Sequence, residues 1–347
     1  MTGHRGRLLG GAVLAVVLLV FFFRGMDWNA LGTALREARL IPLLGLVVVT
    51  LGVYAARAWR WGDLLLPLGR VPYPDLFSAT MVGFASGLLI PRAGELLRPW
   101  LISRRHPIAT SAGFATIILE RLLDLITVLL LFAVYLFVLP APAAQIEGRL
   151  TELLKLGGAV TAAVALGVLV FLLALHANAE RVIGTLEKLL TRAPLWLAEP
   201  CSKILRAFSS GLAVLRAPFP LLAKIGLESL VVWLLIALGF HLNHMAFGIE
   251  LPFHATFLLM AFLVVGVAIP TPGMVGGFHA FYLLALSEVF GMPRATAAAA
   301  AVAAHALSNL PILAGGLVLL GREGLSLGRV AEVTREQGTL SESEVRS

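Results

Sequence analysis

The chain has 347 residues, of which 59% are hydrophobic and 14% are charged, and its mean hydropathy is +0.91. A soluble globular domain carries roughly 25% charged residues, whereas long apolar runs spread over the whole chain are typical of a multi-pass membrane protein. The net charge of +7 lies between the apolar runs, so it indicates an anionic lipid surface and no nucleic acid as its partner. The single cysteine, Cys201, excludes a disulfide framework and a cysteine-ligated zinc site.

The N-terminal part of the chain predicts two transmembrane helices. Residues 8–23 are apolar and follow basic residues, but no small-residue cleavage site comes after them, so we expect a retained helix and not a signal peptide. Residues 41–61 are long enough to span a bilayer. The end of this span combines cations with aromatic rings, which is typical of an anchor at the membrane surface: Arg57, Trp59, Arg60 and Trp61.

A broken helix comes next. Residues 76–90 are apolar but too short to span the bilayer, and a break that contains proline and glycine separates them from a second short segment, residues 96–102. Non-helical backbone is tolerated at membrane depth where protein or water covers it, so we expect a re-entrant helical hairpin here. Residues 112–139 then predict a long span.

The middle of the chain interrupts this pattern. Residues 156–176 predict another span. Residues 177–218 carry apolar side chains on one helical face and charges on the other, which predicts basic amphipathic helices that lie on the membrane surface.

The C-terminal part repeats the order of the N-terminal part. A span over residues 219–247 precedes a second broken hairpin, whose two segments cover residues 254–269 and 274–290. Residues 295–320 predict the last span. We expect the polar tail that follows to be disordered.

These segments together predict an all-α, polytopic membrane helical bundle with about six to eight embedded helices. Most lysines and arginines fall on one side when both hairpins return to the side they entered from, so we expect both termini to be cytoplasmic. We assign residues 1–321 to one transmembrane domain in the cytoplasmic (cell) membrane and residues 322–347 to a short cytoplasmic tail.

Two motifs indicate an internal repeat with units 41–139 and 219–320, joined by the surface linker 177–218. The run IPRAG at residues 90–94 aligns with IPTPG at residues 269–273, and a long helix follows each hairpin. The predicted topology gives the two units opposite orientations. Inverted repeats with paired broken helices indicate a transporter whose site lies near the bilayer midplane. The alternative is that a common helix-breaking motif occurs twice by chance.

Charged residues at membrane depth gather in the first unit. Charge there is costly unless it faces a partner or a wet cavity, and arginine binds phosphate through a planar fork of donors. We therefore predict a site for a lipid phosphate, in which the acidic residues hold the arginines, bind a cationic head group or carry protons. The alternative is a salt-bridge network that only seals the hairpin. The candidate residues are Arg92, Glu95, Arg98, Glu120, Arg121 and Asp124.

The second break carries no charge. Its glycines allow close backbone approach and its prolines end a helix, so we expect it to line the opposite entrance of the site or, alternatively, to form a packing corner. The candidate residues are Pro270, Pro272, Gly273 and Gly276.

Further along, His305 and Asn309 are predicted to bond between helices or to line the cavity. His241 and His244 have a spacing that suits a metal, but the only carboxylate near them is Glu250, so we expect no metal and no cofactor.

Three of these motifs occur in a familiar order. PRAGELLR at residues 91–98, ERLLD at 120–124 and PTPGMVG at 270–276 together resemble the lysylphosphatidylglycerol synthase transmembrane region, a flippase-like membrane domain family. The resemblance covers nearly the whole chain. The family usually reads Pro-Gly-Gly-x-Gly in the last motif, and Met274 stands here in place of the second glycine.

The resemblance implies a lipid flippase or transporter, because this domain of the full synthases translocates an aminoacylated phospholipid that a separate C-terminal domain makes. That synthase domain has no counterpart here, so we expect no enzyme. The expected partners are membrane lipids (an anionic phospholipid, a polyprenyl lipid or a hopanoid-like lipid) and lipid-synthesis enzymes. Two alternatives remain open: a membrane-embedded transferase that acts on lipid-linked substrates, and a non-transporting scaffold of a lipid-synthesis complex.

Overall fold

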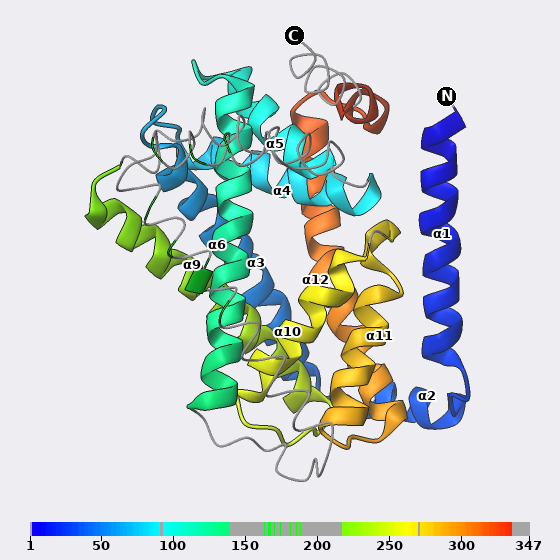
Figure 1. Cartoon of the computed structure of the whole chain (residues 1–347). Helices are drawn as coiled ribbons and strands as arrows, with labels where there is room; N and C mark the ends of the chain where they lie inside the picture. The colour runs from blue at the N-terminus through cyan, green and yellow to red at the C-terminus, as the bar shows by residue number, and fades with distance from the viewer. Residues whose placement is uncertain are drawn as a thin grey trace.

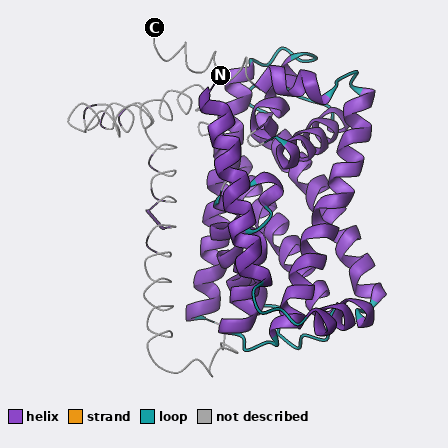
Figure 2. Ribbon diagram, turned by 90° about the vertical axis from the view of Figure 1, so that its right-hand side faces the viewer, coloured by secondary structure: helices purple, strands orange, loops and turns teal. Residues whose placement is uncertain are grey.

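The computed structural model describes residues 2–90, 93–138, 217–269 and 271–334, together with isolated positions between residues 163 and 188. Helices and their connecting loops make up all of these ranges, and no strand occurs within them (Figures 1 and 2). The predicted all-α class is therefore confirmed. The predicted span 156–176 and the amphipathic linker 177–218 lie outside the described residues, apart from those isolated positions and residues 217–218.

The N-terminal helix turns sharply at its end. Helix α1 (Thr2–Phe23) is followed by α2 (Trp28–Glu37), and the two axes differ by 89°. Asp27 begins α2, since its carboxylate accepts hydrogen bonds from the backbone N–H groups of Asn29 and Ala30 at 2.9 and 3.0 Å. The segment between the first two predicted spans is thus partly helical, which the apolar pattern alone did not indicate.

The N-terminal part of the chain contains the first predicted broken hairpin. Helix α3 (Leu40–Leu65) leads into α4 (Tyr73–Leu89), and α5 (Ala93–Ser103) follows the break. Helix α6 (Thr110–Phe137) is the long helix that comes next. These bounds agree with the predicted segments to within a turn.

The C-terminal part has a similar order of long and short helices. Helix α9 (Phe219–Ala246) precedes α10 (Ala255–Ala268), and the break contains the short 3-10 turn η1 (Pro272–Met274). Helix α11 (Gly277–Leu284) continues into one π-helical turn, η2 (Ala285–Val289). The last long helix is α12 (Arg294–Arg322).

Helix length and surface composition both suit a bilayer. Within the described ranges, α3, α9 and α12 are long and apolar enough to cross a membrane, and the bent pair α1 and α2 adds a fourth crossing if it is one span. Helix α6 has a similar length of 28 residues but carries three charged side chains. Large apolar side chains such as Ile41, Val48 and Val318 are exposed on the long helices. A surface of this kind is suited to lipid and indicates a multi-pass membrane protein.

Each broken hairpin closes through a pair of glycines. A Cβ atom on Gly94 of α5 would lie against the carbonyl oxygen of Gly83 of α4. A Cβ atom on Gly266 of α10 would lie 2.7 Å from the carbonyl oxygen of Gly277 of α11. The two backbones in each hairpin therefore touch at positions where only glycine fits. The two pairs also have the same internal spacing along the chain.

The two hairpins lie in opposite halves of the molecule (Figure 1). Helices α4 and α5 are near the end at which α1 begins, whereas α10 and α11 lie towards the other end. Each half has its own apolar core. One core includes Trp61, Leu97 and Ile117, and the other includes Phe240, Leu258 and Tyr282.

The expectation of a disordered tail is wrong for its first part. Residues 327–334 are helical and lie at the same end of the molecule as the start of α1 (Figure 1). Val330 and Val333 are buried against the core around Trp61. The polar composition of the tail concealed this contact, because two buried valines are enough to dock one short helix.

Candidate functional site

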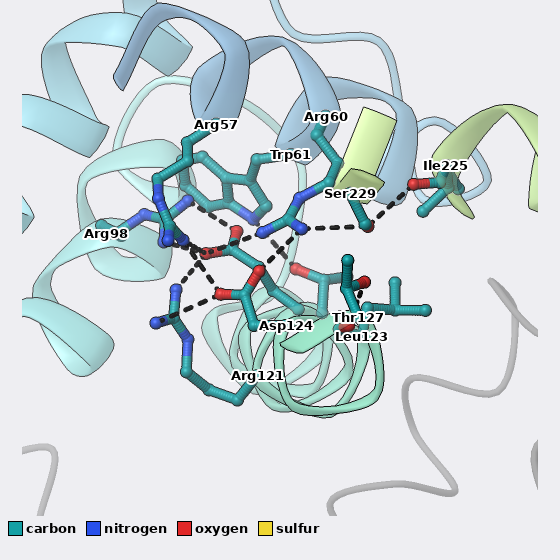
Figure 3. A network of polar contacts seen from close by, with 12 residues as sticks. Arg57, Arg60, Trp61, Arg98, Arg121, Leu123, Asp124, Thr127, Ile225 and Ser229 are labelled. Carbon is teal, nitrogen blue, oxygen red and sulfur yellow. Dashed lines mark hydrogen bonds and ion pairs between the residues drawn. The ribbon is translucent and has the colours of Figure 1, made fainter. Parts of the chain in front are cut away.

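A buried group of charged side chains joins three helices in the half that holds the first hairpin. Its guanidinium groups converge on two carboxylates (Figure 3). We call this group the arginine cluster. Its members are Arg57 and Arg60 on α3, Arg98 on α5, and Glu120, Arg121 and Asp124 on α6.

Asp124 ties α3 to α6. Arg57 donates to its Oδ2 atom at 2.9 Å, and Arg60 donates to its Oδ1 atom at 2.8 Å. The indole N–H of Trp233, on α9, also donates to Oδ1 at 3.1 Å. Arg121 lies 3.5 Å from Oδ2, so three arginines surround this carboxylate (Figure 3).

Glu120 ties α5 to α6. Arg98 donates two parallel hydrogen bonds to its two carboxylate oxygens, each 3.0 Å long. Such a two-pronged pair fixes both side chains in orientation as well as in distance. Arg121 donates to the same carboxylate. Arg57 and Arg60 lie 3.8 and 3.7 Å from it.

Neutral side chains of neighbouring helices also contact the arginines of the cluster. Arg60 also donates to the hydroxyl of Ser229 at 2.9 Å, which connects α9. The guanidinium of Arg98 lies 4.3 Å from the centre of the Trp61 ring, at cation–π distance. The indole N–H of Trp61 donates in turn to Thr116 at 3.0 Å. Four helices therefore hold the cluster in one arrangement.

The charges of the cluster do not balance. Arginine is always protonated in proteins, so four guanidinium groups face two carboxylates. Arg60 and Glu120 are 0% exposed, and Arg121 is the most accessible member with 40% of its side chain exposed. Four buried N–H positions in the cluster also have no hydrogen-bond partner: Arg60 Nε, Arg60 Nη2, Arg98 Nε and Arg121 Nε. A surplus of positive charge together with free donors favours the binding of an anion.

The prediction that the end of α3 is a surface anchor is wrong for most of its residues. Arg57, Arg60 and Trp61 are buried in and beside the cluster, and only Trp59 projects outward, 58% exposed. The signal was available in the spacing, since Arg57, Arg60 and Trp61 share one helical face and Trp59 does not. Aromatic residues at the end of a span favoured the anchor interpretation instead. Ser229 and Trp233 carried no charge and gave no comparable signal.

The structure brings together four of the six predicted charged residues: Arg98, Glu120, Arg121 and Asp124. Glu95 is exposed on α5 and makes no hydrogen bond or ion pair with any described residue, although its charge acts electrostatically on Arg121. Arg92 and Pro270 lie outside the described residues.

The predicted residues of the second break form a separate region. Gly273 and Gly276 adopt positive φ angles of 61° and 91°, and Pro272 opens the 3-10 turn between the helices. His305 of α12 hydrogen-bonds to the Gly273 carbonyl at 2.9 Å, which confirms a bond between elements for His305, whereas Asn309 donates to the His305 carbonyl within α12. A Cβ on Gly273 would lie 3.8 Å from the Leu88 carbonyl, so this turn lies against the end of α4. Its glycines make no direct contact with the arginine cluster among the described residues.

The family model for the lysylphosphatidylglycerol synthase transmembrane region matches residues 8–316 of this chain. The chain belongs to this family. The match extends from α1 to the last turns of α12 and so includes both hairpins and the whole arginine cluster.

Three curated proteins from two organisms are similar to the chain. Glycosyltransferase AglD of Haloferax volcanii is 24% identical over 96% of this chain, which spans 57% of the length of AglD. Two proteins of Methanothermobacter thermautotrophicus, each called a UPF0104 membrane protein, are 23% and 24% identical. They match 88% and 93% of this chain, over 90% and 97% of their own lengths.

Two of the three motifs that resemble this family meet in the cluster. Residues 91–98 supply Arg98, and residues 120–124 supply Glu120, Arg121 and Asp124. The third motif forms the turn around Gly273, in the half that holds the second hairpin. The family motifs are therefore placed at the two helix breaks and at the ion pairs that fix the first of them.

Proposed function

We propose that this chain moves an anionic lipid between the leaflets of the cell membrane, and that the arginine cluster receives the lipid head group. The observation that carries the proposal is the surplus of guanidinium groups over carboxylates in a buried, four-helix setting. An uncompensated charge inside a membrane protein is costly and marks a substrate or ion pathway. Arginine is also the side chain best suited to phosphate recognition.

The arrangement of the hairpins supports transport over simple binding. Both units, 41–139 and 219–320, contain a broken hairpin closed by a glycine pair of the same spacing, and the hairpins lie in opposite halves (Figure 1). This is the arrangement expected of an inverted repeat, in which one unit rocks against the other around a fixed site. In this proposal both termini are cytoplasmic and the two hairpins are re-entrant.

A membrane-embedded transferase acting on lipid-linked substrates is the second candidate. It is favoured by the relative named as a glycosyltransferase, of which this chain spans 57%. Such a reaction needs an activated donor in addition to the lipid. The arginine cluster would then hold the phosphate of a lipid-linked acceptor or donor.

Proteoliposomes distinguish the candidates. Head-group-labelled phospholipids and a labelled polyprenyl phosphate are incorporated separately, and a membrane-impermeant quencher reports the fraction of label in the inner leaflet. Arg121→Gln is the informative variant, because Arg121 is the least buried arginine of the cluster and its replacement leaves Glu120 and Asp124 with other arginine partners. Arg104→Gln is the matched control, since Arg104 stacks on Trp100 outside the cluster.

We expect one class of anionic lipid to cross the bilayer, with movement lost in Arg121→Gln and kept in Arg104→Gln. Absence of movement for every lipid, with folded protein and an imposed proton gradient, would contradict the translocase. Product formed from an activated donor in detergent would support the transferase. Co-purification with lipid-synthesis enzymes without transport would support a scaffold.

A further inference from the structure

The surplus charge of the arginine cluster also bears on which anion it receives. Each of the four guanidinium groups contacts a carboxylate, but the cluster holds only two carboxylates, so it has two more positive than negative charges. The exposed carboxylate of Glu95 on α5 attracts Arg121 electrostatically from outside the cluster and forms no ion pair with it. The next charged group along α3 and α9 is Asp63 with Lys224 and Glu228. Within this group Lys224 forms ion pairs with Asp63 at 2.6 Å and with Glu228 at 3.6 Å. Among the described residues, the group makes no ion pair with the four arginines of the cluster.

The free donors are numerous enough for several acceptor oxygens. The buried N–H positions without a partner come from three different arginines, Arg60, Arg98 and Arg121, which stand on three different helices. A ligand with oxygens pointing in several directions satisfies such a set better than a ligand with two oxygens on one side. The directions of the donors and the surplus positive charge therefore both favour an anion with more than two acceptor oxygens.

The phosphate groups of lipids differ in their charge and in their number of free acceptor oxygens. A terminal phosphate monoester carries a charge of about −1.5 to −2 at neutral pH and has three free acceptor oxygens. The phosphodiester of phosphatidylglycerol carries a single charge and presents only two free oxygens. The monoester therefore neutralises the cluster, whereas the diester leaves one buried positive charge uncompensated.

We propose that the arginine cluster selects lipids that end in a phosphate monoester or a diphosphate over lipids whose phosphate is a diester. This inference rests on the proposed function for the assignment of the cluster as a head-group site. It goes further in naming the class of phosphate. Polyprenyl phosphates and phosphatidic acid both carry such a group, so the chemistry is shared by two kinds of lipid chain.

The accessible edge of the cluster is where we expect this phosphate to bind. Arg121 is the most exposed member, and the guanidinium carbons of Arg57, Arg98 and Arg121 lie 5.5, 5.5 and 5.7 Å from the centre of the half-buried Phe84 ring. The ring gives this edge an apolar wall beside its donors. A phosphate that binds here meets arginines from three helices while its lipid chain remains on the apolar side.

A binding experiment in two matched pairs tests the inference. The full chain is placed in nanodiscs of phosphatidylcholine, and a labelled polyprenyl phosphate is displaced by unlabelled competitors. Polyprenyl phosphate is compared with its methyl ester, and phosphatidic acid with phosphatidylglycerol, so that chain type and phosphate class vary separately. Inorganic phosphate is a fifth competitor, which distinguishes a lipid site from a site for the free ion.

At pH 7.5 we expect each monoester to bind at least about tenfold more tightly than its diester partner, because it gains a charge and an acceptor oxygen in a buried site. The preference falls at pH 5, where the monoester is close to singly charged. Arg121→Gln reduces the preference, and Arg104→Gln leaves it unchanged.

Equal affinity within both pairs, or tighter binding of the diesters, would overturn the inference. Inorganic phosphate that competes as well as the lipid monoesters would overturn the assignment to a lipid. The binding result and the transport result are independent. Selective binding without lipid movement supports this inference and contradicts the translocase. Lipid movement without selective binding supports the translocase and contradicts this inference.

Discussion

Arg98 and Glu120 are joined by two parallel hydrogen bonds of 3.0 Å, and they connect the short second helix of the first hairpin to the long helix that follows it. Both side chains are fully or almost fully buried. The pair therefore fixes the position of the helix break relative to the bundle. Its geometry also sets where the remaining arginines can direct their free N–H groups.

Breaking this pair is expected to destabilise the protein strongly. In Glu120→Gln the buried Arg98 loses its carboxylate partner, and removal of one partner of a buried ion pair costs about 3–5 kcal/mol. Arg98→Lys keeps the charge but loses the two-pronged geometry, so we expect a smaller loss. Thermal unfolding of the purified protein in detergent measures both. A melting temperature of Glu120→Gln equal to that of Arg104→Gln would show that the pair does not stabilise the fold.

Neutralising an acid and neutralising an arginine are expected to have unequal effects. Asp124→Asn raises the surplus of positive charge in the cluster, whereas Arg57→Gln lowers it. Both side chains are almost fully buried and they contact each other at 2.9 Å, so lost packing is comparable. We therefore expect Asp124→Asn to lower the melting temperature more than Arg57→Gln does. The reverse order would argue that the cluster has no surplus charge to neutralise.

Much of the fold could be predicted from the sequence, because long apolar runs and proline–glycine breaks report directly on helix length. This pattern predicted both hairpins. Charged residues within or next to the apolar runs predicted four members of the arginine cluster, namely Arg98, Glu120, Arg121 and Asp124. Arg57 and Arg60 were not predicted as members, since an arginine near the end of a span reads as a surface anchor unless its helical face is known. Which face is buried depends on α6 and α9, which come later in the chain and supply Asp124 and Ser229.

The glycine pairs were equally hidden from the sequence. Glycine is common in membrane helices, and only the packed structure shows which glycines touch another backbone. Gly83 and Gly94 do so in the first hairpin, and Gly266 and Gly277 in the second. The docked helix at residues 327–334 was missed for a related reason, because two valines in a polar segment give no periodic signal.

The glycine pairs make a prediction that tests the likeness of the two hairpins. Gly94→Ala and Gly277→Ala each place a methyl group against a backbone carbonyl of the facing helix, which cannot move aside without opening the hairpin. We expect both to lower the melting temperature to a similar extent. Gly52→Ala and Gly226→Ala are the controls, since nothing lies within 4 Å of a Cβ at either position. In these helices alanine should be neutral or stabilising, by up to about 1 kcal/mol. A normal melting temperature for Gly94→Ala would mean that α4 and α5 do not pack as closely as described.

The turn of the second break contains a residue in a conformation that favours glycine. Met274 has a φ angle of 59° and is the only non-glycine residue with a positive φ among the described residues. A side chain in this left-handed region costs roughly 1–2 kcal/mol, and part of that cost returns with glycine as greater chain entropy in the unfolded state. Met274→Gly, which restores the residue usual in the family, is therefore expected to stabilise the protein by up to about 1 kcal/mol.

The neighbouring residue supplies the control for this last prediction. Val275 has a φ angle of −66°, which any residue adopts, so Val275→Gly gains no relief of strain and should lower the melting temperature through chain entropy and the loss of a partly buried side chain. Opposite shifts for the two glycine variants would confirm that the turn holds Met274 in a strained conformation. If Met274→Gly instead lowers the melting temperature as Val275→Gly does, the methionine side chain contributes packing that outweighs its backbone strain.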